Sequence, residues 1–370
     1  MLCEDKKQNT SYLTIRGKRF HYIWLRENCP SCRYTEPLQQ LYDPKISDRP
    51  ENPRPLSVEL REQEDKLVID WDENPRHRSV FSIDWLLKNS YDSHPPQEAN
   101  NYFLWNKEQI SLRSPQVFDA LSIKDDSWID QLFSLGFVVI ENISPDKLEP
   151  FLSSVGPIYN VDYGTIFTLE NGVMNPKSPR RPDGCGLPPH NDLSYWGAHR
   201  LAQFLYCVEH DAIGGESTLV DGFKVAEDFR ADYPEYFQRL VETPVQFWLL
   251  DKDHHYQFCN TAPILECDSN GELKTVRFSK RNCRPHLPFE QLEDFYLAHN
   301  TFFNYLKNPD YQYQFRLKPH SCLLFQNFRT LHGRTAFDPN TGKRKLNAGY
   351  VDWNFFVGRK QFIKNELTFS

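Results

Sequence analysis

The sequence of 370 residues lacks several features that mark whole classes of proteins. No apolar run approaches the roughly 20 residues that cross a bilayer, so we expect no membrane association. The first residues contain no apolar segment typical of a signal peptide, which favours a soluble, cytoplasmic protein. No basic stripe stands out and the formal net charge is -7, which argues against a nucleic-acid partner.

Cysteine is present in an odd number, nine, and is scattered along the chain. This pattern argues against a disulfide framework and favours reduced thiols. Only Cys29 and Cys32 are closely spaced. The sequence also has no internal repeat and no low-complexity block.

The alternating patterns divide the chain into two parts. Residues 1–92 contain short strand-like runs and predict a small β-rich domain. Residues 93–112 are expected to be a linker, because few residues at the start of this range are apolar. Residues 113–370 form the larger part. Within the first part we expect a hairpin from 12–15 and 20–25, a strand at 66–71, and a short helix after Ser82.

Strands dominate the second half of the larger part. Two amphipathic helices are expected near 224–241 and 289–306, and a further helix at 128–135 precedes a buried strand at 137–140. Many short strands with a few flanking helices favour a mainly β fold of the jelly-roll type, covered by helices. The expected strands after residue 190 are 201–208, 217–220, 276–278, 313–317, 322–325 and 348–354.

One constellation in this part carries chemistry. His190 and Asp192 alternate along an extended segment, so their side chains point to the same side. With the distant His332 they have the ligand types of a 2-His-1-carboxylate triad, which holds Fe(II) and leaves positions open. A His-x-Asp triplet often occurs by chance. Arg344, twelve residues after His332, strengthens the interpretation because a guanidinium anchors a dicarboxylate in a bidentate way.

The chain, which contains these four residues, resembles the γ-butyrobetaine and trimethyllysine hydroxylase group of Fe(II)/2-oxoglutarate dioxygenases. The resemblance covers nearly the whole chain, with the shared elements in the same order. It rests on Trp24–Pro30, Pro189–Asp192, Gly214–Phe223, Leu331–Arg334 and Ala348–Trp353.

The resemblance implies a double-stranded β-helix that holds iron through His190, Asp192 and His332. Arg344 would pair with the distal carboxylate of 2-oxoglutarate, and Ser217 would lie near that cosubstrate. O2 would be consumed and ascorbate would serve as reductant. The implied reaction is hydroxylation of a C–H bond in a small substrate, as in carnitine biosynthesis, by a homodimer.

The substrates of this group carry a trimethylammonium ion, which aromatic rings recognise. The candidate substrate-binding residues are Tyr163, Phe167, Tyr350 and Leu193. Leu193 departs from the pattern of the γ-butyrobetaine enzymes, which tend to have tyrosine at this position. The alternatives are an aromatic cage that uses Tyr195 or Trp196, and an anionic substrate that binds Arg180 and Arg181.

The resemblance also implies a structural zinc in the N-terminal domain. Cys29, Cys32 and His77 supply three ligands, whereas such a site normally has four. Cys3 is a remote fourth candidate, and two reduced thiols without metal are the alternative.

Two other functions stay open. The same iron site could catalyse desaturation or oxidative rearrangement of a different small metabolite. A non-catalytic, cupin-like binding module is the other alternative, and the presence of all three ligands and Arg344 argues against it.

Overall fold

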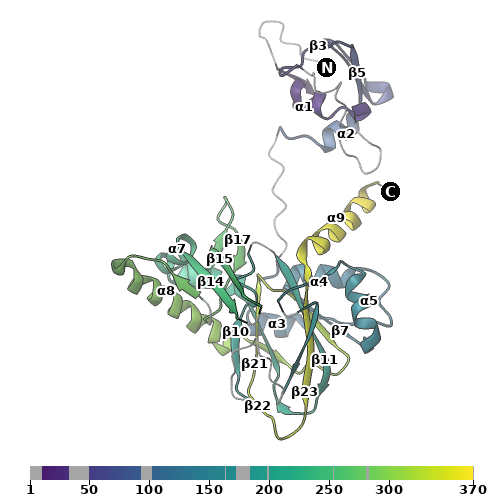
Figure 1. The fold of residues 1–370 in the computed structure, drawn as a ribbon. Helices are drawn as coiled ribbons and strands as arrows, with labels where there is room; N and C mark the ends of the chain where they lie inside the picture. Colours follow the sequence, from purple (N-terminus) through teal and green to yellow (C-terminus); the bar gives the residue numbers. More distant parts are fainter. Residues whose placement is uncertain are drawn as a thin grey trace. The chain divides into compact units, whose positions relative to one another are not determined.

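The computed structural model describes residues 11–32, 50–92, 102–162, 164–171, 184–197, 200–252, 254–280 and 283–369. The chain forms two compact units, Met1–Asn100 and Asn101–Ser370 (Figure 1). Each unit has its own hydrophobic core, and each is described here by itself. Among the described residues, no helix is both long enough and apolar enough to cross a membrane.

The first unit is built from a hairpin and a three-stranded antiparallel sheet. The predicted helix begins after Ser82, whose hydroxyl accepts a hydrogen bond from the Trp85 amide. The predicted second strand of the hairpin is shorter than expected, because Trp24 and Leu25 lie in a helix. The elements are β1 (Tyr12–Ile15), β2 (Lys18–His21), α1 (Tyr22–Glu27), β3 (Pro55–Arg61), β4 (Lys66–Trp71), β5 (His77–Ser82) and α2 (Ile83–Lys88).

The second unit contains two sheets that form the jelly roll. The larger has the order β6-β7-β20-β11-β23-β8, with β9 also paired to β23, and the smaller has the order β10-β21-β13-β19. The larger sheet comprises β6 (Val117–Asp119), β7 (Phe137–Glu141), β8 (Ile158–Tyr159), β9 (Ile166–Glu170), β11 (Leu201–His210), β20 (Cys322–Gln326) and β23 (Arg344–Asp352). The smaller comprises β10 (Leu187–His190), β13 (Ser217–Asp221), β19 (Tyr313–Phe315) and β21 (Thr330–Arg334).

Strand β11 is buried on both faces, which explains its nearly continuous apolar sequence. Ala202 and Phe204 pack in one cluster with residues of the helices α4 (Ser127–Leu135), α5 (Leu148–Ser153) and α9 (Trp353–Phe369). Leu205 and Cys207 point to the opposite face and pack in a second cluster with Leu219 of the smaller sheet. Residue 203 therefore faces the space between the two sheets.

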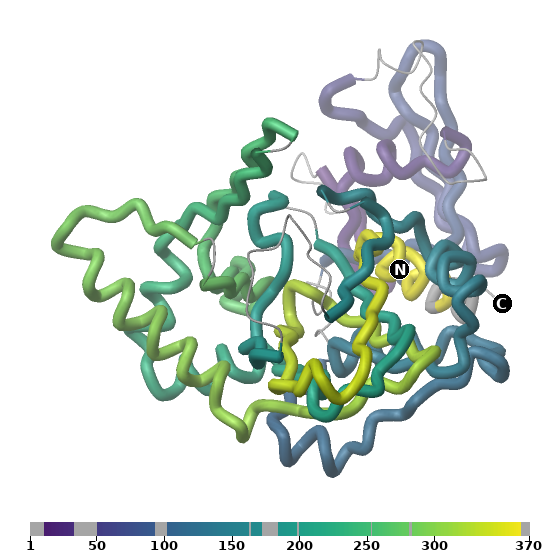
Figure 2. Tube along the Cα trace, turned by 60° about the horizontal axis from the view of Figure 1, so that its bottom comes forward, coloured from purple at the N-terminus to yellow at the C-terminus, as the bar shows by residue number. Residues whose placement is uncertain are grey.

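The other flank of the second unit carries a helical and β-hairpin region. Figures 1 and 2 show α7 and α8 on one side of the sheets and α4 and α5 on the other. One long helix was expected at 224–241, but Pro234 starts a new helix because it cannot continue the preceding one. The elements are α6 (Gly222–Asp232), α7 (Pro234–Glu242), β14 (Pro244–Asp251), β15 (Tyr256–Pro263), β16 (Leu265–Cys267), β17 (Leu273–Val276), β18 (Cys283–Pro285) and α8 (Phe289–Lys307), with β12 (Ile213–Gly214) and β22 (Phe337–Asp338) forming a separate two-stranded sheet.

The second unit begins at Asn101 rather than at the predicted residue 113. Trp105 is fully buried and donates its indole N–H to the carbonyl of Leu135 over 2.8 Å. A fully buried ion pair between Arg329 and Asp221, 2.8 Å apart, also fixes this segment, since Arg329 donates to the Phe103 carbonyl. Helix α3 (Lys107–Arg113) follows directly. The end of the expected linker is therefore part of the folded second unit.

Candidate metal centre

Two neighbouring strands of the smaller sheet bring the distant histidines together. β10 and β21 are antiparallel, and His190 and His332 are register partners across them. Their ring centroids lie 4.4 Å apart. Because the backbone hydrogen bonds of adjacent strands set this approach, the pair does not depend on a flexible loop.

Asp192 completes the cluster from the turn that follows β10. One carboxylate oxygen, Oδ1, lies 3.3 Å from His190 Nε2, and the other, Oδ2, lies 3.5 Å from His332 Nε2. One ligand atom from each of the three residues falls within 4.8 Å of the others. Two imidazoles and one carboxylate suit Fe(II) with open positions, so the donor set fits that ion.

The surroundings prepare these groups as ligands. His190 Nδ1 lies 3.0 Å from the Pro188 carbonyl and donates to it, so Nε2 is the ring nitrogen that faces the other two residues of the cluster. Burial raises the pKa of Asp192, but hydrogen bonds and attraction from His190 and His332 outweigh it, so the pKa lies well below its usual range. The carboxylate is therefore ionised at neutral pH.

The turn that carries Asp192 is held by two asparagines. Asn327 accepts a hydrogen bond from the Asp192 amide over 3.1 Å and donates to the Asp192 carbonyl over 2.8 Å. Asn191 donates to the Asn327 carbonyl and accepts from the Phe278 amide. Leu193, which follows, has a φ of 56° and is 9% exposed. The turn that carries Asp192 is thus held by the side chains of Asn191 and Asn327.

The carboxylate also reaches the larger sheet. Asp192 Oδ2 accepts hydrogen bonds from Gln203 Nε2 over 2.8 Å and from the Tyr350 hydroxyl over 3.3 Å. The Tyr350 ring lies 6.2 Å from that of Phe167, so these two predicted substrate-binding residues are neighbours. Tyr163, the third predicted aromatic residue, lies outside the described residues, as do Arg180 and Arg181.

Arg344 begins β23 and lies in a positively charged region. Its Nε donates to the Gly215 carbonyl over 3.3 Å, and it has no carboxylate within salt-bridge distance among the described residues. Burial, Arg334 and Arg316 lower the pKa of Arg344 to about 10, so it remains charged at neutral pH. Ser217 is the register partner of Arg334. A guanidinium in this setting suits a dicarboxylate.

The sequence reasoning missed Gln203, Asn327 and Arg334. Gln203 is a lone amide in the apolar run of β11, a signal that could have been noticed. Arg334 is two residues after His332 on the same strand, so strand alternation places both on one face.

Comparison with known proteins agrees with this geometry. The family model described as taurine catabolism dioxygenase TauD, TfdA family matches residues 92–350. The chain belongs to the TauD/TfdA family. A γ-butyrobetaine dioxygenase from Pseudomonas sp. (strain AK-1) is 29% identical, with 93% of this chain and 90% of the relative covered. A mitochondrial trimethyllysine dioxygenase from Gallus gallus is 26% identical, with 90% and 80% covered.

Among solved structures, PvcB from Pseudomonas aeruginosa has a TM-score of 0.46 at 17% identity, covering 62% of this chain and 81% of PvcB.

Membership in the TauD/TfdA family makes this chain a 2-oxoglutarate-dependent dioxygenase with Fe(II) as its cofactor. When bound, Fe(II) activates O2 and couples decarboxylation of 2-oxoglutarate to oxidation of a small-molecule substrate. The predicted enzyme class and jelly-roll fold are confirmed.

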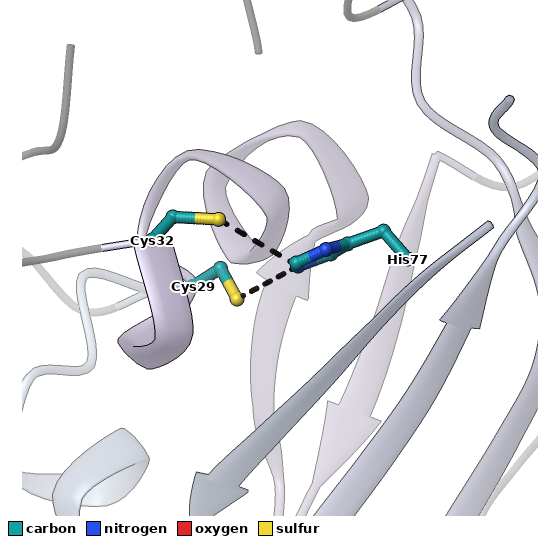
Figure 3. A group of neighbouring side chains, drawn as sticks. All are labelled: Cys29, Cys32 and His77. Carbon is teal, nitrogen blue, oxygen red and sulfur yellow. Dashed lines mark hydrogen bonds between the residues drawn. The ribbon is translucent and has the colours of Figure 1, made fainter. Parts of the chain in front are cut away.

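The first unit of the dioxygenase contains a second ligand cluster, formed by Cys29, Cys32 and His77 (Figure 3). His77 Nε2 lies 3.1 Å from Cys29 Sγ and 3.6 Å from Cys32 Sγ. Arg26 donates to Cys32 Sγ over 3.4 Å. Within the described part of the chain, these are three of the four ligands that structural zinc prefers, and Cys3 falls outside it.

Proposed function

We propose that this dioxygenase hydroxylates a C–H bond of a small molecule that carries a quaternary ammonium group. The observation that carries the proposal is the similarity along 93% of the chain to a relative named γ-butyrobetaine dioxygenase. In the balanced reaction, the substrate C–H, O2 and 2-oxoglutarate give the C–OH product, succinate and CO2. Each turnover therefore adds one oxygen atom to the substrate.

We assign the iron ligands to His190, Asp192 and His332. Their convergence within 4.8 Å supports this assignment, as does the agreement of the donor set with Fe(II). Arg344 is assigned to the distal carboxylate of 2-oxoglutarate, with Ser217 nearby. Arg344 is half-buried and has no carboxylate partner among the described residues, which supports this second assignment.

Aromatic residues in the second unit support a cationic substrate. Tyr350 contacts Asp192 and lies beside Phe167, whereas Tyr195 and Trp196 pack against each other and against Phe258. Asp162, whose carboxylate lies 3.3 Å from the Tyr195 hydroxyl, adds a negative charge beside the Tyr195 ring. Ring faces and a carboxylate together suit a weakly hydrated cation, and a neutral substrate would gain less from them.

The decisive experiment offers the iron-loaded enzyme a panel of trimethylammonium, betaine and phosphonate compounds. Mass spectrometry then records a gain of one oxygen, and succinate is measured in parallel. We expect turnover of at least one trimethylammonium compound and much weaker turnover of its neutral analogue, in which carbon replaces nitrogen. Equal turnover of the two analogues would refute recognition of the cation. A product two hydrogens lighter would identify a desaturase instead.

We also propose that Cys29, Cys32 and His77 bind zinc in the first unit, with the fourth position filled by a ligand outside the described residues or by water. Thiolate and imidazole ligands favour zinc over a hard cation. Both cysteines are free and buried, which agrees with a structural role for this metal.

A further inference from the structure

Asp192 meets two donors that come from one pair of opposed positions on the larger sheet. Gln203 of β11 and Tyr350 of β23 are register partners, and both donate to the same carboxylate oxygen, Oδ2. Each of the two side chains is 1% exposed. Because an ionised carboxylate only accepts hydrogen bonds, the atom of the Gln203 amide that faces it must be the nitrogen.

The two oxygens of Asp192 are therefore not equivalent. A carboxylate oxygen has about two lone-pair directions, and two donors occupy those of Oδ2. Oδ1 receives neither of these two hydrogen bonds and lies 3.3 Å from His190 Nε2, whereas Oδ2 lies 3.5 Å from His332 Nε2. A metal held by both histidines is thus expected to meet Oδ1.

Burial of the Gln203 amide also lowers the stability of the folded protein. Its Oε1 is buried and has no hydrogen-bond partner among the described residues. A buried amide with an unpaired oxygen destabilises a protein relative to an apolar side chain of similar size. The hydrogen bond from Gln203 Nε2 to Asp192 Oδ2 is the polar contact of this side chain that the structure shows.

We propose that Gln203 and Tyr350 are positioning residues that hold Oδ2 and thereby restrict Asp192 to coordination through Oδ1 alone. The proposal rests on the iron ligands assigned above. An octahedral ion held by three protein atoms keeps three positions, which 2-oxoglutarate and O2 need. A carboxylate that turned to bind through both oxygens would take one of them.

The test measures metal binding directly, without turnover. Co(II) is titrated calorimetrically into the metal-free full chain, and its visible absorption reports the coordination number. For Tyr350→Phe, which removes one oxygen atom, we expect several-fold weaker binding and an altered Co(II) spectrum. For Gln203→Leu we expect a loss in affinity of about 10- to 100-fold, the range for partners of metal ligands. The melting temperature of the metal-free protein should stay equal or rise.

Gln326 provides a matched control on the neighbouring strand β20. It is also fully buried, and both of its polar atoms lack partners among the described residues. It is the register partner of Ala202, so it faces away from Asp192. Gln326→Leu should leave the Co(II) affinity and spectrum unchanged.

The outcomes separate the possible explanations. If Tyr350→Phe and Gln203→Leu both keep wild-type Co(II) affinity and spectrum while Asp192→Ala loses binding, the positioning role is wrong. If Asp192→Ala itself keeps wild-type binding, the assigned iron ligands are wrong. If Gln203→Leu weakens Co(II) binding and also lowers the melting temperature, the Co(II) affinity of Tyr350→Phe decides whether the positioning role stands: weaker binding supports it and wild-type binding contradicts it.

Discussion

The two candidate metal-binding clusters of this dioxygenase have a similar arrangement of residues but differ in ligand chemistry. Each combines two residues close in sequence with a third from a distant strand, and each brings its ligand atoms within 4.8 Å. The cluster in the second unit offers two nitrogens and a carboxylate. The cluster in the first unit offers two sulfurs and one nitrogen. Spacing alone therefore does not distinguish them, whereas ligand type does.

Their surroundings differ as well. Around Asp192, the neutral donors Gln203 and Tyr350 fix the carboxylate, and Arg344 of the same unit has no carboxylate partner among the described residues. Around Cys32, Arg26 is already paired with Glu73 over 2.6 Å, so its charge is neutralised within the unit. The two units therefore differ in whether a guanidinium is already paired with a carboxylate, and the proposed cosubstrate site lies in the unit where it is not.

Removal of an iron ligand should have the largest effect and should leave the first unit intact. We expect His332→Ala to lower succinate formation at least about 100-fold, since even the loss of residues behind metal ligands costs about 10- to 100-fold. Cys29→Ser is the control and should keep most of the activity. Substantial turnover by His332→Ala would remove the basis for the proposed centre.

Removal of the charge at Arg344 should have the second-largest effect on catalysis. Arg344→Ala is expected to raise the KM for 2-oxoglutarate about 10- to 150-fold, because a charge-assisted hydrogen bond contributes about 1.5–3 kcal/mol. Steady-state kinetics with varied 2-oxoglutarate measures this change. Lys343→Ala, at an exposed neighbouring position, should have little effect. An unchanged KM in Arg344→Ala would show that another residue, such as Arg334, anchors the cosubstrate.

Disruption of the cysteine cluster should have the smallest effect on catalysis. We expect His77→Ala to lose about one equivalent of zinc and to lower the melting temperature of the first unit, because structural zinc contributes to folding. The KM for 2-oxoglutarate should not change. Elemental analysis by mass spectrometry measures the zinc, with His21→Ala as the control. Wild-type protein purified without chelator and free of zinc would contradict the assignment.

The sequence predicted that His190, Asp192 and His332 lie together, as the structure shows, but not which side chains surround them. His190 and Asp192 could be paired because alternation in an extended segment is a local property. Gln203 and Arg334 depend on which strands lie opposite each other, and that pairing follows from the packing of the two sheets. The start of the second unit was likewise missed, because Trp105 is fixed by partners far along the chain.

The register of β10 against β21 has a further consequence for how the protein acquires its activity. A shift of β21 by one residue would turn His332 to the other face of the sheet and separate the two imidazoles. If both histidines bind iron as proposed, the metal binds only to the strands paired in the observed register and stabilises that register.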